Sequence, residues 1–219
     1  MAFFVRSDRS TTGPLGVVLG VAVATVVLTS TPSAVVAGGL GGNAIPFTGL
    51  NPIPITGSET SFFGGLGMSC AAPGECAGSG YYTDADGFQG FVVTQTEGVW
   101  GDAEPVPGLK SLNVGDEAYA LSVSCAAPGE CAGSGYYRDA AGSQGFVVEQ
   151  TEGVWGDAEP LPGLKSLNVG DDARAVEVSC AAPRECSATG YYRPDADSYQ
   201  GFVVTQTEGV WGDAEPVPG

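Results

Sequence analysis

The chain is 219 residues long, and its 25 acidic and 8 basic residues, with no histidine, give a net charge of −17 at pH 7. So negative a surface repels nucleic acid and anionic membranes. The lack of histidine excludes hydrolases that use the usual serine or cysteine triad, and it leaves carboxylates as the available acid and base groups.

The N-terminal residues 1–37 have the order of a secretory signal peptide. Two arginines, Arg6 and Arg9, precede an apolar run from Leu15 to Leu28, and small residues follow that run. Cleavage is predicted after Ala37. The alternative is an uncleaved membrane anchor, but the apolar run is shorter than the roughly 20 residues of a spanning helix. The sequence therefore predicts a secreted, extracellular protein with no membrane contact after the signal is removed.

One sequence then occurs three times. Residues 38–65 are rich in Gly and Pro and are expected to form a linker or an irregular first element. The repeat domain follows over residues 66–219, with copies at about 69–123, 124–178 and 179–219 and a period of 55 residues. The third copy carries one inserted residue. Such a period indicates a duplicated supersecondary unit that stacks on its neighbours.

Each repeat is predicted to be four short antiparallel strands in up-and-down order, with no helix. In the second copy, Tyr119, Leu121, Val123 and Cys125 alternate on one predicted face of a strand. Turn sequences then separate the strands: Ala-Ala-Pro-Gly, Asp-Ala-Asp-Gly and a two-residue Glu-Gly hairpin at Glu97-Gly98. The paired prolines after each tryptophan end the unit, because proline cannot pair in a central strand.

The six cysteines all lie in the repeats and in register. An even number of cysteines in a chain predicted to be exported indicates disulfide bonds. Six cysteines allow 15 pairings, and repeat symmetry favours the set in which each repeat joins its own pair: Cys70–Cys76, Cys125–Cys131 and Cys180–Cys186. Zinc binding is the competing interpretation, but the C-x5-C spacing and the lack of histidine disfavour it.

These motifs resemble a known kind of repeat over residues 69–219. A Ser-Cys strand end, a short turn, Cys-x-x-x-Gly-Tyr-Tyr and a Thr-x-Thr-Glu-Gly-x-Trp hairpin resemble the Cys-paired β-propeller-like tandem repeats of bacterial exported proteins, which are distantly similar to Asp-box repeats. Asp boxes carry Asp where this chain has Thr96, Thr151 and Thr207, so the resemblance implies no sialidase activity.

The resemblance implies an all-β fold of tandem four-stranded units. Three units are fewer than the about four to eight blades of a typical propeller, so a partial or shared β-propeller is expected. A β-trefoil, which also has three four-stranded repeats, is the alternative.

Two sets of residues are candidates for binding. Asp84, Asp86, Asp195 and Asp197 alternate two apart in a polar turn, as the oxygen ligands of calcium do, and calcium is the one candidate cofactor. A turn that needs Asp-Gly explains the same residues without a metal. The second set is Tyr82, Tyr137 and Tyr192, which are candidates for stacking on sugar rings. Because neighbouring side chains in a strand face opposite sides, the alternative is one core and one surface tyrosine in each Tyr-Tyr pair.

No catalytic residue is predicted, because the carboxylates recur in register whereas catalytic groups should break the repeat pattern. The sequence therefore predicts a secreted, non-enzymatic binding or surface-interaction module for a protein or glycan ligand. The alternatives are a carboxylate-dependent glycan-active enzyme and a lectin-like sugar-binding domain. Self-association is expected through the uncovered face of the last unit.

Overall fold

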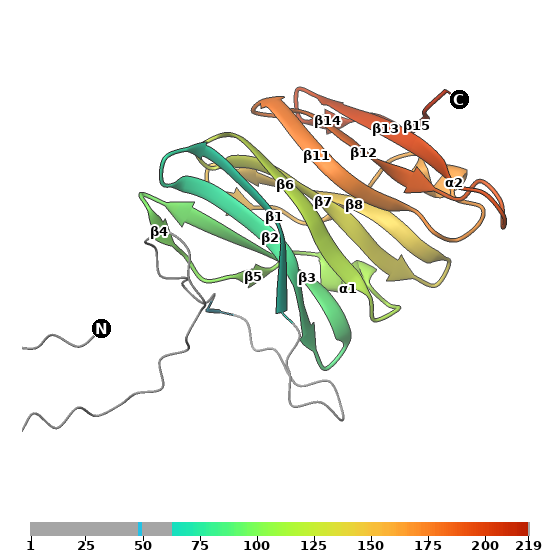
Figure 1. Ribbon diagram of the computed structural model, residues 1–219, viewed down its shortest axis with the longest axis horizontal. Helices are drawn as coiled ribbons and strands as arrows, with labels where there is room; N and C mark the ends of the chain where they lie inside the picture. The colour runs from blue at the N-terminus through green and yellow to red at the C-terminus, as the bar shows by residue number, and fades with distance from the viewer. Residues whose placement is uncertain (1–47, 50–62, 219) are drawn as a thin grey trace, which may run out of the picture. The chain divides into compact units, whose positions relative to one another are not determined.

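The computed structural model describes residues 48–49 and 63–218. The predicted signal peptide lies outside this part of the chain, as does most of the predicted linker. Each repeat forms one antiparallel sheet (Figure 1). The first sheet contains β1 (Phe63–Ala72), β2 (Glu75–Asp84), β3 (Gly87–Thr96), β4 (Val99–Trp100) and β5 (Glu104–Pro105).

The other two sheets repeat this order. The second sheet contains β6 (Ala118–Ala127), β7 (Glu130–Asp139), β8 (Gly142–Thr151), β9 (Val154–Trp155) and β10 (Glu159–Pro160). The third contains β11 (Arg174–Ala182), β12 (Glu185–Tyr192), β13 (Gln200–Thr207), β14 (Val210–Trp211) and β15 (Glu215–Pro216). The predicted all-β class and the four-stranded antiparallel units are confirmed. A further strand of two residues pairs with the third long strand of each sheet.

The predicted turns are present. Glu97 and Gly98 connect β3 to β4 with φ angles of 52° and 81°, and positive φ at both residues is the geometry of a type I′ hairpin turn. Pro73 and Gly74 connect β1 to β2, where Ala72 lies opposite Glu75.

The first strand of each sheet departs from the predicted alternation. In β6 the pairing with β7 shifts between Ala120 and Ser122, because a β-bulge places an extra residue there. Ala118 and Ala120 are buried before the bulge and Val123 after it, whereas Tyr119 and Leu121 lie on the other, half-buried side. The prediction that Tyr119, Leu121 and Val123 share one face was therefore wrong.

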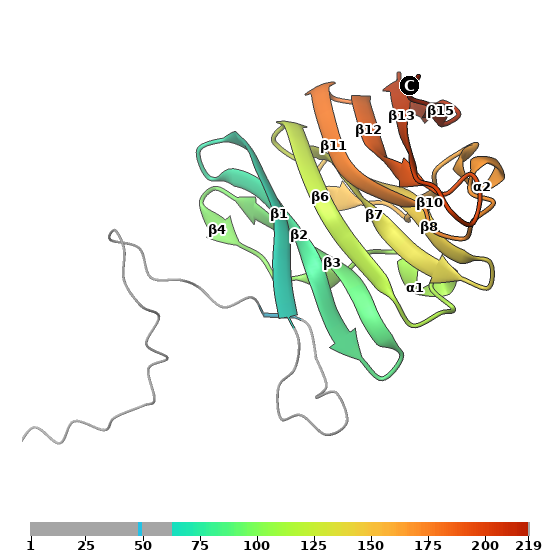
Figure 2. The same ribbon diagram turned by 45° about the vertical axis from the view of Figure 1, so that its right-hand side comes forward.

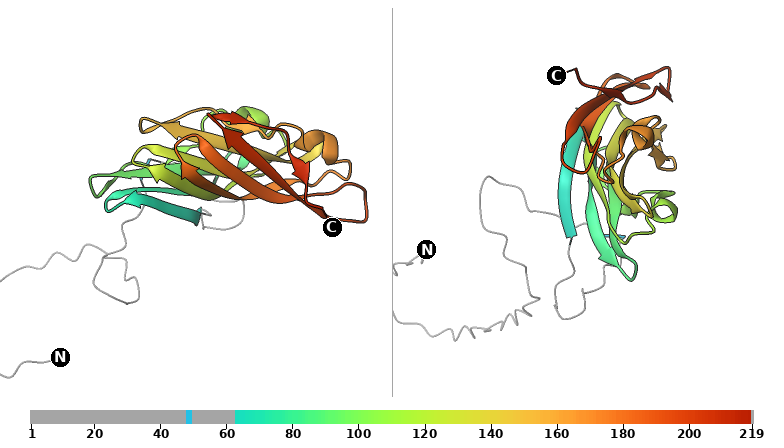
Figure 3. Two further views of the ribbon diagram at one scale, coloured as in Figure 1. Left: turned by 90° about the horizontal axis from the view of Figure 1, so that it is seen from above. Right: turned by 90° about the vertical axis from the view of Figure 1, so that its right-hand side faces the viewer.

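The three sheets are stacked through their first strands. β1, β6 and β11, each the first strand of its sheet, lie side by side (Figure 2). Two one-turn helices, α1 (Leu109–Leu112) and α2 (Leu164–Leu167), connect the sheets, on the side away from β1 and β11 (Figure 3). The prediction of no helix was wrong here. Leu109 and Leu164 anchor these turns because both are buried in the core.

The core fills the spaces between successive sheets. Phe146 and Val148 face the first sheet and pack with its Val92, while Phe202 and Val204 of the third sheet pack with Val147. The first strands β6 and β11 begin several residues before the predicted starts of the second and third copies. Within the described residues, each sheet is formed by one continuous stretch of chain, and no closed barrel is formed. The sheets therefore do not support the β-trefoil alternative, because barrel closure needs an unbroken ring of paired strands.

Candidate binding surface

The predicted disulfide bonds are confirmed. Cys70–Cys76, Cys125–Cys131 and Cys180–Cys186 are bonded, and no cysteine is free. In each sheet the two cysteines lie directly opposite one another on the first two strands. Every cysteine sulfur is thus used within its own hairpin, so no free thiol is available to bind a metal.

The predicted calcium carboxylates of the first repeat bind a lysine. Asp84 Oδ1 accepts a hydrogen bond from the backbone N–H of Asp86 at 2.8 Å. Lys110 Nζ lies 3.0 Å from Asp84 Oδ2 and 2.6 Å from Asp86 Oδ2. The ammonium group therefore supplies the positive charge between the two carboxylates.

The carboxylates of the third repeat form a local turn. Asp195 Oδ1 accepts hydrogen bonds from the backbone N–H groups of Asp197 and Ser198 and from the Ser198 hydroxyl. These bonds, first that of Asp197, lower the pKa of Asp195. Among the described residues, no cluster of three or more Asp, Glu, Cys or His side chains is placed to hold a metal ion. Calcium at these turns remains an untested prediction.

The three tyrosines predicted to stack on sugars are in the core. Tyr82, Tyr137 and Tyr192 are each at most 5% exposed, and each belongs to one of the three hydrophobic core clusters. They are therefore not available to a ligand in this structure. Strand alternation turns the two rings of each pair to opposite faces of the sheet. Tyr136, the first tyrosine of its pair, is also only 5% exposed, because Tyr119 and Arg174 pack against it.

The first tyrosines instead join a continuous row of side chains across the three sheets, which we name the aromatic ladder. Its members are Tyr81, Phe88, Tyr119, Tyr136, Arg174, Tyr191, Arg193 and Tyr199. Tyr119 stacks between Phe88 and Tyr136, with ring centroids 5.4 and 5.1 Å away, and Arg174 lies 4.2 Å above the Tyr136 ring. Each contact joins one sheet to the next or adjacent strands of one sheet.

The end of the aromatic ladder on the third sheet is the most open. Tyr199 is 61% exposed, and it packs edge-on against Tyr191 with the Arg193 guanidinium 5.4 Å from its ring centre. Tyr199 lies in the segment lengthened by the inserted residue of the third repeat. The insertion therefore lies next to the most accessible ring of the ladder.

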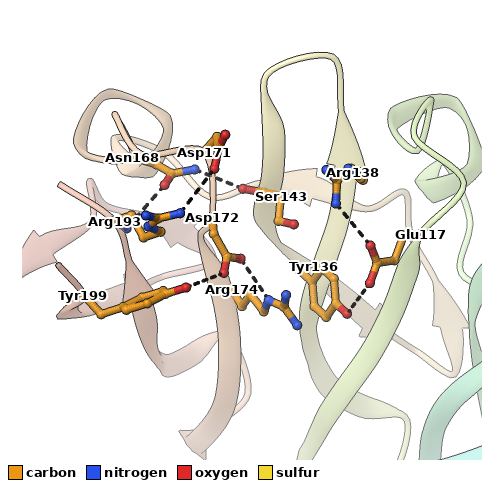
Figure 4. A network of polar contacts seen from close by, with 10 residues as sticks. All are labelled: Glu117, Tyr136, Arg138, Ser143, Asn168, Asp171, Asp172, Arg174, Arg193 and Tyr199. Atoms are coloured by element: carbon orange, nitrogen blue, oxygen red, sulfur yellow. Dashed lines mark hydrogen bonds and ion pairs between the residues drawn. The ribbon is translucent and has the colours of Figure 1, made fainter. Parts of the chain in front are cut away.

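Two carboxylates, Asp172 and Glu117, bind side chains of the ladder (Figure 4). Asp172 accepts Arg174 Nε at 3.0 Å through Oδ1 and the Tyr199 hydroxyl at 3.2 Å through Oδ2. Glu117 likewise accepts the Tyr136 hydroxyl at 3.2 Å and pairs with Arg138 at 3.4 Å. The tyrosines of the ladder are therefore held in place by hydrogen bonds to carboxylates and by contacts with guanidinium groups.

Two buried asparagines position this end of the sheets. Asn168 donates Nδ2–H to Ser143 O at 3.0 Å and accepts the Arg193 backbone N–H at 3.4 Å, which ties the second sheet to the third. Asn113 makes the equivalent bonds to Phe88 O and Arg138 N. Both asparagines follow the one-turn helices, so each Leu-Lys-Ser-Leu-Asn connection clamps two sheets beneath the ladder.

Burial raises the pKa of two ladder tyrosines, Tyr119 and Tyr136. Loss of water contact, together with the charge of Glu117, raises the pKa of Tyr119 to about 12. Burial also raises the pKa of Tyr136, against the lowering effect of Arg174. At neutral pH these side chains are therefore uncharged hydrogen-bonding rings, and the charges of the surface come from arginine and carboxylate groups.

The repeats differ at three positions in or beside the ladder. Equivalent positions hold Gly64, Tyr119 and Arg174; Thr83, Arg138 and Arg193; and Phe88, Ser143 and Tyr199. The paired cysteines and the tryptophans of the scaffold stay the same in all three repeats. Sequence reasoning missed this surface, although a position-by-position comparison of the three repeats carried the signal.

One carboxylate also breaks the repeat elsewhere. Glu149 stands where the other repeats have Thr94 and Thr205. It lines a hollow of about 150 Å³ between the second and third sheets, together with Asp157, Glu159 and Trp211. Glu149 Oε1 accepts hydrogen bonds from Gln206 Nε2 and, at 2.8 Å, from Trp211 Nε1. One oxygen of this carboxylate is thus engaged in joining the two sheets.

The comparisons assign no class to this arrangement. No family model matches the chain, and neither does any curated protein sequence. In the part of the chain that the structure describes, no helix has the length and apolar character needed to cross a membrane.

Proposed function

We propose that the protein is an exported, non-enzymatic binding or surface-interaction module, built as a partial or shared β-propeller. Three disulfide bonds favour an oxidising compartment such as the cell exterior. The antiparallel sheets with adjacent first strands support this proposal, because consecutive propeller blades also bring one strand of each sheet next to that of its neighbour. The resemblance to Cys-paired propeller-like repeats supports the same proposal.

The aromatic ladder carries the proposal. It crosses all three sheets, it contains three positions at which the repeats differ, and its Tyr199 ring is exposed beside the Arg193 guanidinium. Rigid scaffolds present binding residues at variable positions, and tyrosine offers a large contact area with a polar tip. The ligand is a glycan or a protein segment that lays a ring or planar group against Tyr199.

The experiment is a binding screen against glycans and extracellular proteins, repeated with two variants of one residue. Tyr199→Ala should weaken binding about five- to tenfold, since a stacked aromatic contact contributes about 1 kcal/mol. Tyr199→Phe keeps the ring and should bind within about twofold of the parent protein. Binding that is unaffected by Tyr199→Ala, or is lost equally in both variants, contradicts a ring-stacking site.

Glu149 allows the enzymatic alternative to be tested. It is the carboxylate that breaks the repeat pattern and lines a hollow, which is where hydrolysis of a glycan would need an acid or base. Glu149→Thr restores the residue of the other repeats and keeps a hydrogen-bond acceptor. Turnover of any glycoside by the parent protein that disappears in Glu149→Thr would overturn the non-enzymatic proposal.

A further inference from the structure

The sheets are joined by contacts that recur at each boundary. At the first boundary, Thr94 Oγ1 accepts hydrogen bonds from Gln150 Nε2 at 2.8 Å and Trp155 Nε1 at 3.2 Å. At the second, Glu149 takes the place of Thr94 and binds Gln206 and Trp211. Each sheet therefore offers one acceptor to the glutamine and tryptophan of the following sheet.

A second contact recurs between the neighbouring first strands, from β1 to β6 and from β6 to β11. Ser69 Oγ accepts the backbone N–H of Cys125 at 3.0 Å, and Ser124 Oγ accepts that of Cys180 at 3.0 Å. The serine before the first cysteine of one repeat thus accepts a hydrogen bond from the backbone N–H of the first cysteine of the next repeat. Together with the threonine or glutamate acceptor, it fixes the register of one sheet on the next.

The third sheet exposes the accepting half of this interface. Val92 and Val147 face the following sheet and are 0% and 1% exposed, whereas the equivalent Val203 is 44% exposed. Thr205 and Ser179, the counterparts of the two acceptors, are also exposed. The outer face of the third sheet therefore carries the same apolar contact and the same acceptors as the two faces that are already covered.

The first sheet exposes part of the donating half. Val123 and Val178 pack against the preceding sheet and are 6% and 3% exposed, whereas the equivalent Met68 is 66% exposed. Farther along the same face, Tyr82, Phe91 and Val93 are already at most 5% exposed, so the open part of this face is the end beside Met68. Gln95 makes the bond within its own turn that Gln150 also makes, 3.1 Å to the glycine carbonyl. The Nε2 group of Gln95 is therefore the counterpart, on the first sheet, of the Gln150 Nε2 group that donates to Thr94.

The first sheet makes the same backbone hydrogen bond to the segment before it as the other two sheets do. The Ala103 backbone N–H donates to Thr48 O at 2.7 Å, as Ala158 donates to Pro107 O at 2.8 Å and Ala214 to Pro162 O at 2.9 Å. In the second and third repeats this contact exists beside a packed preceding sheet. The Thr48 contact is consequently compatible with a sheet docked in front of Met68.

Polar residues on the third sheet fit the same interface. Thr189 replaces Ser134, and its hydroxyl already donates to Phe202 O at 2.7 Å, so its burial leaves no donor unpaired. Glu177 replaces Ser122, whose Oγ accepts the Val178 backbone N–H at 3.3 Å. A carboxylate at this position offers the same acceptor to the backbone of a docked strand.

We propose that the outer face of the third sheet binds the first sheet of a second copy of this chain, head to tail. Thr205 and Ser179 of one copy then receive Gln95 and the Cys70 backbone N–H of the other. Such a heterologous contact closes into a ring or grows as a filament. A closed pair would contain six sheets, within the range of about four to eight blades of propellers. This inference depends on the sheet contacts alone, so it stands or falls separately from ligand binding.

Directional cross-linking tests the geometry. Thr205→Cys and Gln95→Cys proteins are prepared separately, their three native disulfides are verified by mass mapping, and the two are mixed under mild oxidation. We expect a covalent dimer that contains one chain of each kind, because Thr94 and Gln150 touch at the equivalent positions. Dimers that form mainly from Thr205→Cys alone indicate face-to-face pairing and would overturn the proposal.

Sedimentation tests the energetics with a matched pair of variants. Val203→Lys places a charge in the proposed interface and should weaken self-association about tenfold or more, because an unpaired buried charge is strongly unfavourable. Val210→Lys, at a residue 70% exposed on a hairpin tip, should leave self-association unchanged. A monomer at all concentrations, or an equal effect of both variants, would refute the head-to-tail contact.

Discussion

Glu149 accepts the indole N–H of Trp211 at 2.8 Å across the boundary between the second and third sheets. At the preceding boundary a threonine hydroxyl, Thr94 Oγ1, does the same for Trp155 at 3.2 Å. Two residues of different charge and length therefore perform one structural task. The shared requirement is an oxygen acceptor that reaches a buried indole and a buried glutamine at once.

This equivalence predicts the stability of two variants of Glu149. Glu149→Ala leaves the donors of Gln206 and Trp211 without their acceptor in a buried place, which should lower the free energy of unfolding by about 1–3 kcal/mol. Glu149→Thr copies the first boundary and should change it by less than about 1 kcal/mol. Urea denaturation followed by tryptophan fluorescence measures both. Negligible losses in both variants would show that the acceptor does not matter, and equal large losses would show that a threonine hydroxyl does not replace the carboxylate.

A second prediction concerns the asparagine clamps. Asn168→Ala removes the bonds to Ser143 O and Arg193 N at a position that is 8% exposed, and we expect a loss of about 1–3 kcal/mol. Ser166→Ala, on the exposed surface of the same helix, is the control and should be near neutral. Hydrogen exchange of β12 and β13 should quicken in Asn168→Ala only. Unchanged exchange would contradict a clamp between sheets.

The hairpins of each sheet were predictable because their signals are local. Pro-Gly and Glu-Gly at fixed places define turns whatever the surroundings, and paired cysteines six residues apart fit one hairpin. The bulge near Leu121 and the one-turn helix at Leu109 were not predictable. The bulge depends on how the first strand of a sheet packs against the neighbouring sheet, and the helix depends on how the segment between two sheets packs. The residue pattern within one segment does not reveal either.

The candidate site was predicted in kind but not in place. A tyrosine pair in a strand indicates one buried and one outward ring, yet the choice of Tyr82 over Tyr81 had no local signal. Tyr137 and Tyr192 are buried in clusters that include residues of the preceding sheet, whereas Tyr82 is buried with residues of its own repeat. The stacking of Tyr119 between Phe88 and Tyr136 joins residues from two repeats, and only the packed structure brings them together.

The disulfide bonds should be local staples. Replacing Cys125 and Cys131 together by serine frees a loop of few residues, so the unfolded chain gains little entropy and the expected loss is roughly 2 kcal/mol. Mass mapping of the parent protein under non-reducing conditions should find the three bonds within repeats. Complete unfolding of the double variant at room temperature would mean that the bond does more than close its hairpin.

Calcium is expected to leave the thermal midpoint unchanged. Lys110 Nζ already lies within 3.0 Å of carboxylate oxygens of both Asp84 and Asp86, so a divalent ion would have to displace it. Lys110→Met removes that competitor and serves as the comparison. A rise in midpoint of the parent protein with millimolar calcium, reversed by a chelator, would establish the metal site that the Asp-x-Asp spacing suggests.

Alkaline pH should destabilise the protein through its buried tyrosines. Burial raises the pKa of Tyr119 and of Tyr137 from 10.0 to about 12, with the neighbouring charges of Glu117 and Asp139 adding to the effect. A pKa that is higher in the folded state means that the folded protein holds the proton more tightly. The resulting stabilisation is complete below pH 10 and is lost as the pH rises toward 12. Urea midpoints measured across this window should therefore fall. Tyr137→Phe has no proton to lose, and its stability should decline less steeply over the same window. Identical slopes for parent and variant would show that the Tyr137 hydroxyl does not titrate with this shift.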